Sequence, residues 1–282
     1  MIAVIDIGSN SVRLMLWADG KSILKRLLTT RLGAGIHNRC LSEQSMIRSA
    51  EAVAYLFDEA KKAGAQEVYV FATAAVRSAA NQEEFLKRVK AACGLNIDVV
   101  SGEREASLAA FGALGSGDGI VIDVGGASSE VICIQGGAKV YAKSFPIGAV
   151  TLLERCLDDK AKTDAYLKDV FGELSQLKGK VYAIGGTATA LACLHLALPE
   201  YDAERVQDCY LTKRELTDWK DKLFSYSVAE RKKLAGMEQA RADVIAGGAA
   251  IIAEIVTKIG AEGTYISDRD NLEGYLYERG LI

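Results

Sequence analysis

The sequence has few prolines, few histidines and no closely spaced pair of cysteines, and each absence narrows the class of protein. Only two prolines accompany 27 glycines, so turns must be made mainly by Gly, Asn, Asp and Ser, which is typical of an α/β protein with many short connections. The six cysteines include no C-x-x-C pair, and only His37 and His195 could join them as ligands. A zinc site and a disulfide framework are therefore disfavoured, and we expect reduced cysteines that pack as small core residues.

Long apolar runs and an excess of positive charge are also missing. No run approaches the ~18–20 residues that a membrane span needs, and the N-terminus leads directly into a strand pattern without a basic leader. We therefore predict a cytoplasmic protein that does not bind membranes. The formal net charge is -3, so the field of the whole molecule does not attract nucleic acid or other polyanions. Local arginines and lysines must then bind any phosphate-rich substrate.

What the sequence does contain is a glycine-rich loop between two apolar strand patterns, at residues 119–134, which read G-I-V-I-D-V-G-G-A-S-S-E-V-I-C-I. Glycines let the backbone N–H groups of such a loop approach a phosphate closely. Asp123 before the loop and Glu130 after it carry the hard oxygen ligands that a phosphate-bound Mg²⁺ prefers. A simple β-hairpin with a glycine-rich turn explains the loop about as well when it is taken alone. The residues that we expect to contact phosphate here are Gly125, Gly126, Ala127 and Ser128.

The N-terminus repeats this pattern over residues 2–17, which read I-A-V-I-D-I-G-S-N-S-V-R-L-M-L-W. Aligning Asp6 with Asp123 also brings glycine onto glycine and serine onto serine within the loop. Each copy begins an α/β segment of its own. The repeat therefore predicts two similar domains whose loops face each other across a cleft.

Two later patterns predict helix starts. Asn81 followed by Glu84 is typical of a capping box. Residues 180–191 repeat the succession of a strand, two glycines and a helix start. Because a glycine-rich turn into a helix N-terminus can bind an anion, Gly186 and Thr187 are further phosphate candidates, with Thr187 as the N-cap. Close packing of the helix on the strand is equally consistent with this pattern.

The best candidate for a domain boundary is the glycine-rich span at residues 112–118. It follows a helix pattern and precedes the central loop. We therefore predict domains at residues 1–117 and 118–282. The last helix, near residues 270–279, is a candidate to pack back on the first domain.

A succession of motifs runs through the whole chain: I-D-I-G-S-N-S (5–11), R-L-G-A-G (31–35), T-A-A-V-R-S-A-A-N (73–81), S-G-E-R-E-A-S-L (101–108), I-D-V-G-G-A-S-S-E (122–130), I-G-G-T-A-T (184–189) and R-A-D-V-I-A-G-G (241–248). In this order the motifs resemble those of the exopolyphosphatase and guanosine-pentaphosphate phosphatase family (Ppx/GppA), in a short two-domain form. The resemblance implies an α/β fold of the actin, sugar kinase and Hsp70 (ASKHA) superfamily. That fold has two RNase H-like, actin-like ATPase domains with a cleft between them.

The resemblance also implies a hydrolase that removes the terminal phosphate from inorganic polyphosphate or guanosine pentaphosphate with Mg²⁺ or Mn²⁺. The general base falls on Glu105, where the residues alone favour a surface glutamate at a helix start. Arg77 matches an arginine directed at substrate phosphates, and the simpler alternative is a solvated charge before a helix. Asp123 and Glu130 match the residues that position metal and water. In the first copy, the matching residues are Asp6 as a metal ligand and Ser9, Asn10 and Ser11 as phosphate ligands.

The chain departs from the family pattern at two positions. Ala127 stands where a third glycine is usual, and Arg104 replaces the acidic residue beside the base. Further arginines that could line the site, or equally form surface salt bridges, are Arg13, Arg31, Arg241 and Arg269.

Two alternative functions share the same fold. One is a small-molecule kinase, which would transfer phosphate to an acceptor rather than release it. The other is a non-catalytic nucleotide-binding module. Relatives also suggest a homodimer, although no stretch of the sequence indicates an interface.

Overall fold

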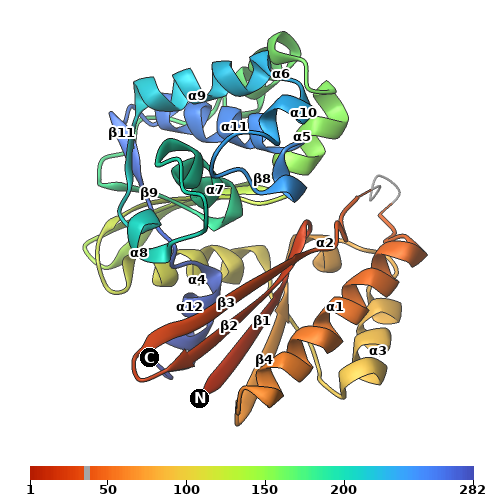
Figure 1. The fold of residues 1–282 in the computed structure, drawn as a ribbon. Coiled ribbons are helices and arrows are strands. Elements are labelled where there is room, and N and C mark those ends of the chain that lie inside the picture. The colour runs from red at the N-terminus through yellow and green to blue at the C-terminus, as the bar shows by residue number, and fades with distance from the viewer. Residues whose placement is uncertain (35–38) are drawn as a thin grey trace. The chain divides into compact units, whose positions relative to one another are not determined.

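The structure is a computed structural model that describes residues 1–34 and 39–282 (Figure 1). The last residue of the R-L-G-A-G motif lies outside the described residues. The chain divides into two compact units, of which the first comprises Met1–Leu108 and Asn271–Ile282 and the second Ala109–Asp270.

The division does not fall at the glycine-rich span that the sequence analysis chose. It lies between Leu108 and Ala109, inside helix α4 (Gly102–Leu114), and helix α12 (Asn271–Glu278) belongs to the first unit. The reason is packing. Leu108 from the middle of α4 and apolar side chains of α12 share one buried cluster with strands of the first sheet.

The first unit is built on a five-stranded sheet in the order β3-β2-β1-β4-β5. Strands β1, β2 and β3 form an antiparallel meander, and β4 and β5 continue the sheet parallel to β1. One face packs against α1 and α3, and the other against α4 and α12 (Figure 1). Besides α4 and α12, its elements are β1 (Ile2–Ile7), β2 (Ser11–Ala18), β3 (Lys21–Thr29), α1 (Glu43–Lys62), β4 (Glu67–Ala72), α2 (Ala74–Arg77), α3 (Gln82–Cys93) and β5 (Asp98–Val99).

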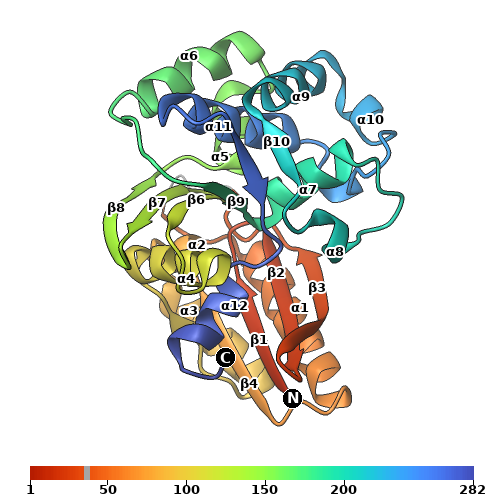
Figure 2. The ribbon, with the colours of Figure 1, turned by 90° about the vertical axis from the view of Figure 1, so that its left-hand side faces the viewer.

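The second unit repeats this topology. Its sheet has the order β10-β11-β9-β6-β7-β8, in which β6, β7 and β8 form the meander and β9 and β11 run parallel to β6. Figure 2 shows α5, α6, α9 and α11 on the same side of this sheet, where their apolar side chains form the main core with those of α7. Its elements are β6 (Gly119–Val124), β7 (Ser129–Gln135), β8 (Ala138–Phe145), α5 (Ala149–Cys156), α6 (Lys160–Val170), β9 (Val181–Ile184), α7 (Gly185–His195), α8 (Ala203–Val206), β10 (Tyr210–Thr212), α9 (Lys213–Ser225), α10 (Val228–Arg231), the 3₁₀ helix η2 (Gln239–Arg241), α11 (Ile245–Lys258) and β11 (Gly263–Ile266).

The repeat extends to the turn of each hairpin. The Gly8 N–H donates to the Ser11 carbonyl at 3.0 Å, and the Gly125 N–H donates to the Ser128 carbonyl at 3.0 Å. These are the positions that the sequence alignment paired. The prediction of two similar α/β segments, each opening on the same hairpin, is therefore confirmed.

Two predicted helix caps are wrong in detail. Helix α3 does begin after Asn81, but the Asn81 side chain makes no cap hydrogen bond. Its amide instead bonds both backbone groups of Leu41, accepting from N at 2.8 Å and donating to O at 3.0 Å. Helix α7 begins at Gly185 with Ile184 as its N-cap, so Thr187 lies inside the first turn. In both cases a side chain that could cap its own helix is held by a more distant segment.

No helix within the described part of the chain is long and apolar enough to cross a membrane.

Candidate functional site

The second hairpin loop is held by the helix that follows the meander. The carbonyls of Gly125 and Gly126 accept hydrogen bonds from the Ala149 and Val150 N–H groups at the start of α5, both at 2.9 Å. Because C=O and N–H point in opposite directions across a trans peptide, the N–H groups of Gly126 and Ala127 point away from α5. The contact therefore turns two loop donors outward, as a phosphate-binding loop requires.

Gly148 makes this contact possible. A Cβ atom there would lie 2.5 Å from the Gly125 carbonyl oxygen and 2.6 Å from the Ala127 nitrogen, so no larger residue fits without displacing the loop. Gly148 is not among the residues predicted from the sequence to contact phosphate. Its only local signal is a glycine directly before a helix start, and the loop it contacts lies more than twenty residues earlier in the chain.

The first hairpin loop is held in a similar way by the segment after β3. The Ser9 carbonyl accepts from the Gly33 N–H at 2.8 Å, and the Asn10 carbonyl accepts from the Thr30 N–H at 3.0 Å. The same peptide geometry directs the N–H groups of Asn10 and Ser11 away from this segment. Both predicted phosphate loops thus have their carbonyls bonded by a neighbouring segment.

The two hairpins differ in the charge of one cross-strand pair. Asp6 lies opposite Arg13 in the first, and Asp123 lies opposite Glu130 in the second. Arg13 forms an ion pair with Asp6, with Nη2 at 2.5 Å from Oδ2. The corresponding pair in the second hairpin is two carboxylates. Like charges directly opposite each other in a sheet repel, and a bound cation relieves that repulsion.

This difference bears on the predicted metal ligands. Asp123 and Glu130 offer a hard, doubly anionic donor pair that suits Mg²⁺ or Mn²⁺, and Glu130 is held in place by the Ser144 hydroxyl, which donates to Oε1 at 2.6 Å. Asp6 already has a charge partner in Arg13. Among the residues described, no group of three or more His, Cys, Asp and Glu side chains could hold a metal ion. An ion at the second hairpin would then keep several water or phosphate oxygen ligands, as Mg²⁺ commonly does.

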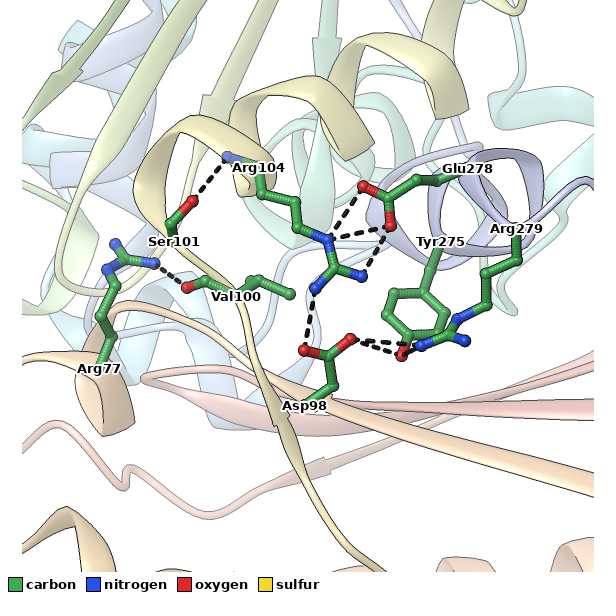
Figure 3. Close-up of polar contacts among 8 residues, drawn as sticks. All are labelled: Arg77, Asp98, Val100, Ser101, Arg104, Tyr275, Glu278 and Arg279. Atoms are coloured by element: carbon green, nitrogen blue, oxygen red, sulfur yellow. Dashed lines mark hydrogen bonds and ion pairs between the residues drawn. The ribbon is translucent and has the colours of Figure 1, made fainter.

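The predicted base and the predicted phosphate-binding arginine meet in the first unit. Glu105 is buried in the first turn of α4, with 6% of its surface exposed. Arg77, the last residue of α2, donates from Nη1 to Glu105 Oε2 at 2.6 Å and to the Val100 carbonyl at 3.0 Å (the latter contact in Figure 3). A short contact between a guanidinium and a carboxylate is a strong, charge-assisted hydrogen bond. The solvated arginine and the surface glutamate of the simpler alternatives are thus not what the structure contains.

The turn from β9 into α7 is crowded by two side chains. Thr187 donates its hydroxyl to the Val124 carbonyl at 3.0 Å, which ties α7 to β6 and leaves chiefly its backbone N–H for an anion. The guanidinium of Arg241 lies on Gly186, where a Cβ atom would be 2.3 Å from Nη2. Glu238 accepts from Arg241 Nε at 2.6 Å, so the side chain is fixed while its end faces the turn. Arg241, only a secondary candidate from the sequence, is therefore placed beside a predicted phosphate site.

The family model that describes the Ppx/GppA phosphatase family matches residues 4–281. The chain belongs to this family.

Solved structures support the assignment. The Ppx/GppA enzyme of Aquifex aeolicus is 30% identical to this chain, with a TM-score of 0.80 and 98% of both chains covered. Together with the repeated sheet topology, this similarity confirms the predicted fold class of two RNase H-like (ASKHA) domains.

Two curated relatives are longer than this Ppx/GppA chain. A guanosine-5'-triphosphate,3'-diphosphate pyrophosphatase of Photobacterium profundum is 28% identical over 292 residues, covering 99% of this chain and 59% of the relative. A bifunctional 3-dehydroquinate synthase/phosphatase of Fusobacterium nucleatum is 28% identical over 309 residues, covering 98% of this chain and 46% of the relative. The chain thus spans about half the length of the curated relatives it matches.

Proposed function

We propose that this Ppx/GppA chain is a phosphohydrolase that removes the terminal phosphate from inorganic polyphosphate, guanosine pentaphosphate or both. The observation that carries the proposal is the ion pair between the buried Glu105 and the partly exposed Arg77. One residue of this pair suits proton abstraction and the other suits phosphate binding. The family membership and the printed names of the relatives support the substrate class.

In the proposed reaction, Glu105 accepts a proton from a water molecule as that water attacks the terminal phosphorus. The bond between this phosphorus and its bridging oxygen breaks, and the products are inorganic phosphate and a substrate shorter by one phosphate. Arg77 can bind two phosphate oxygens through its planar guanidinium. Its present contact with Glu105 places that guanidinium beside the base, so the two groups can act on neighbouring atoms of one bound phosphate.

The second hairpin contributes phosphate and metal ligands in this proposal. Asp123 and Glu130 would hold Mg²⁺, and the outward N–H groups of the loop at residues 125–128 would bind phosphate oxygens. The ion, when bound, would offset negative charge on the phosphates. Arg241 would add a fixed positive charge beside the turn at Gly186.

The decisive experiment measures phosphate release by the wild-type protein and by Glu105→Gln. Substrates are polyphosphates of defined length and guanosine pentaphosphate, each with and without Mg²⁺. The substitution keeps the side-chain shape and removes the base, so we expect kcat to fall by roughly 10² to 10⁴ while substrate binding, measured by equilibrium dialysis, persists.

The neighbouring Glu103→Gln provides a matched control in the same helical turn. It should leave kcat close to that of the wild type. Wild-type turnover by Glu105→Gln would refute the assignment of the base, and phosphate transfer to an added acceptor without net release would indicate a kinase.

A further inference from the structure

The guanidinium of Arg104 is held by two carboxylates of the first unit, those of Glu278 and Asp98 (Figure 3). Its Nε lies 2.9 Å from Glu278 Oε1, and its Nη2 lies 2.7 Å from Glu278 Oε2, so the contact with the last turn of α12 is bidentate. Its Nη1 lies 2.9 Å from Asp98 Oδ1 on β5. One side chain therefore connects α4 to both α12 and β5.

The connection continues beyond Arg104. Asp98 Oδ2 accepts from the Tyr275 hydroxyl at 2.9 Å and from Arg279 Nη2 at 3.3 Å (Figure 3). Tyr275 is buried and its ring stacks on Phe71 of the central sheet, with the centroids 4.7 Å apart. Asp98 is thus connected to the packed core through Tyr275, and Glu278 follows Tyr275 in the same helix at an exposed position.

The same helical turn carries Glu105. The Ser101 side chain accepts from the Arg104 N–H at 3.2 Å, and the Ser101 carbonyl accepts from the Glu105 N–H at 2.8 Å. Arg77 then holds the Glu105 carboxylate at 2.6 Å. The first turn of α4 is therefore restrained on one side through Arg104 and on the other through Arg77.

We propose that Arg104 is a positioning residue for Glu105, and that it acts by fixing the first turn of α4 to α12 and β5. This inference rests on the proposed function, in which Glu105 is the base. The partly exposed ion pairs of Arg104, whose side chain is 32% exposed, contribute little to global stability. Their bidentate, networked geometry instead limits rotation of the turn, and a shift of about 1 Å at a base can cost about 10² in rate.

The test compares Arg104→Met and Glu278→Gln with the wild type. Both substitutions remove the bidentate contact with little change in side-chain size. We expect kcat to fall by roughly ten- to one-hundredfold, KM for a short polyphosphate to stay within about twofold, and the melting temperature to stay near that of a control variant. Arg88→Met is that control, because Arg88 also pairs with two glutamates, Glu43 and Glu84, but on the surface formed by α1 and α3.

A further variant separates positioning from simple stability. Arg104→Lys keeps the charge but cannot form the planar bidentate contact, so its kcat should lie between that of Arg104→Met and that of the wild type.

Opposite results would refute the inference. If Arg104→Met and Glu278→Gln both keep the kcat of the wild type, or if every loss follows the folded fraction measured by circular dichroism, Arg104 does not position the base. The proposed function is judged separately, by phosphate release from the wild-type protein, and the assignment of the base is judged by the turnover of Glu105→Gln.

Discussion

At the scale of single residues, the two hairpins differ in the charge of one cross-strand pair. Arg13 lies opposite Asp6 in the first unit, and Glu130 lies opposite Asp123 in the second. The first pair joins opposite charges, whereas the second pair consists of two carboxylates at a strand end. This asymmetry is the reason that we assign metal binding to the second hairpin.

The assignment predicts the behaviour of Glu130→Gln. The variant keeps the shape and the contact with Ser144 but loses one anionic ligand. We expect the Mg²⁺ concentration for half-maximal activity to rise roughly tenfold or more, with most of kcat recovered at saturating Mg²⁺. Glu173→Gln is the control, because Glu173 is an exposed carboxylate that pairs with Lys143. An unchanged Mg²⁺ titration for Glu130→Gln would remove this residue from the metal site.

A second residue-scale prediction concerns alkaline stability. Burial, followed by the hydrogen bond to Asp98, raises the pKa of Tyr275 from 10.0 to about 12. Between these values the unfolded tyrosine loses its proton while the folded one keeps it. The stability contributed by this group is therefore present below pH 10 and is lost as the pH rises from about 10 to 12.

Urea unfolding of Tyr275→Phe across this pH range checks the prediction. The variant should lose less stability than the wild type between about pH 10 and 12, because it has no phenol to titrate there. Tyr55→Phe, at an exposed position on α1, should lose as much stability between about pH 10 and 12 as the wild type does. Equal pH slopes for the wild type and Tyr275→Phe would contradict the assignment.

At the scale of elements, the second phosphate loop depends on the close approach of α5. The helix start can bond the loop carbonyls because residue 148 has no side chain. The loop and the helix therefore support each other, although β7 and β8 separate them in the sequence.

Gly148→Ala should disrupt the contact between the second phosphate loop and α5. The added methyl group would lie 2.5 Å from the Gly125 oxygen, and such overpacking typically costs about 1–3 kcal/mol of unfolding free energy. We expect urea denaturation to show this loss of unfolding free energy, and we expect phosphate to bind more weakly. Gly247→Ala is the matched control within the second unit, since its nearest neighbour is the flexible end of Leu152 at 3.3 Å and alanine favours a helix. Wild-type stability of Gly148→Ala would show that the loop can move without cost.

At the scale of the whole molecule, the net charge of -3 bears on how a polyanion is bound. The field of an acidic protein does not attract polyphosphate from a distance, so in the proposed function a few local cations, such as Arg77 and Arg241, supply the affinity. Each phosphate contact adds to the binding free energy an amount that decreases as the salt concentration rises.

We therefore expect kcat/KM to depend only weakly on the salt concentration. A plot of log kcat/KM against log salt concentration should have a slope of roughly -1 to -3, which corresponds to a few phosphate contacts, and kcat/KM per chain end should reach a plateau for short polyphosphates. Stopped assays with polyphosphates of defined length over a range of NaCl concentrations provide both measurements. A much steeper slope, with processive digestion of long chains, would require an extended basic track.

Much of the fold follows from local sequence patterns. Alternating apolar residues, glycine-rich turns and the repeat of an Asp-containing hairpin correctly predicted β1, β2, β6, β7 and the doubled α/β topology. The physical reason is that strand alternation and turn conformation depend on residues a few positions apart. Such local patterns can be recognised from the sequence alone.

Only the tertiary structure determined which side chains meet. Asn81 has the sequence context of a cap, yet its amide bonds Leu41, and Arg104 sits beside the predicted base but extends to Glu278 at the other end of the chain. The meeting of Arg77 with Glu105, which links two helices of the first unit, could likewise be matched to motifs but not placed in contact. Contacts between residues far apart in sequence depend on how β-strands and helices pack, and packing reflects all elements of a unit at once. The residue types of the candidate site could therefore be predicted from the sequence, whereas the fold decided which of their charged side chains form pairs.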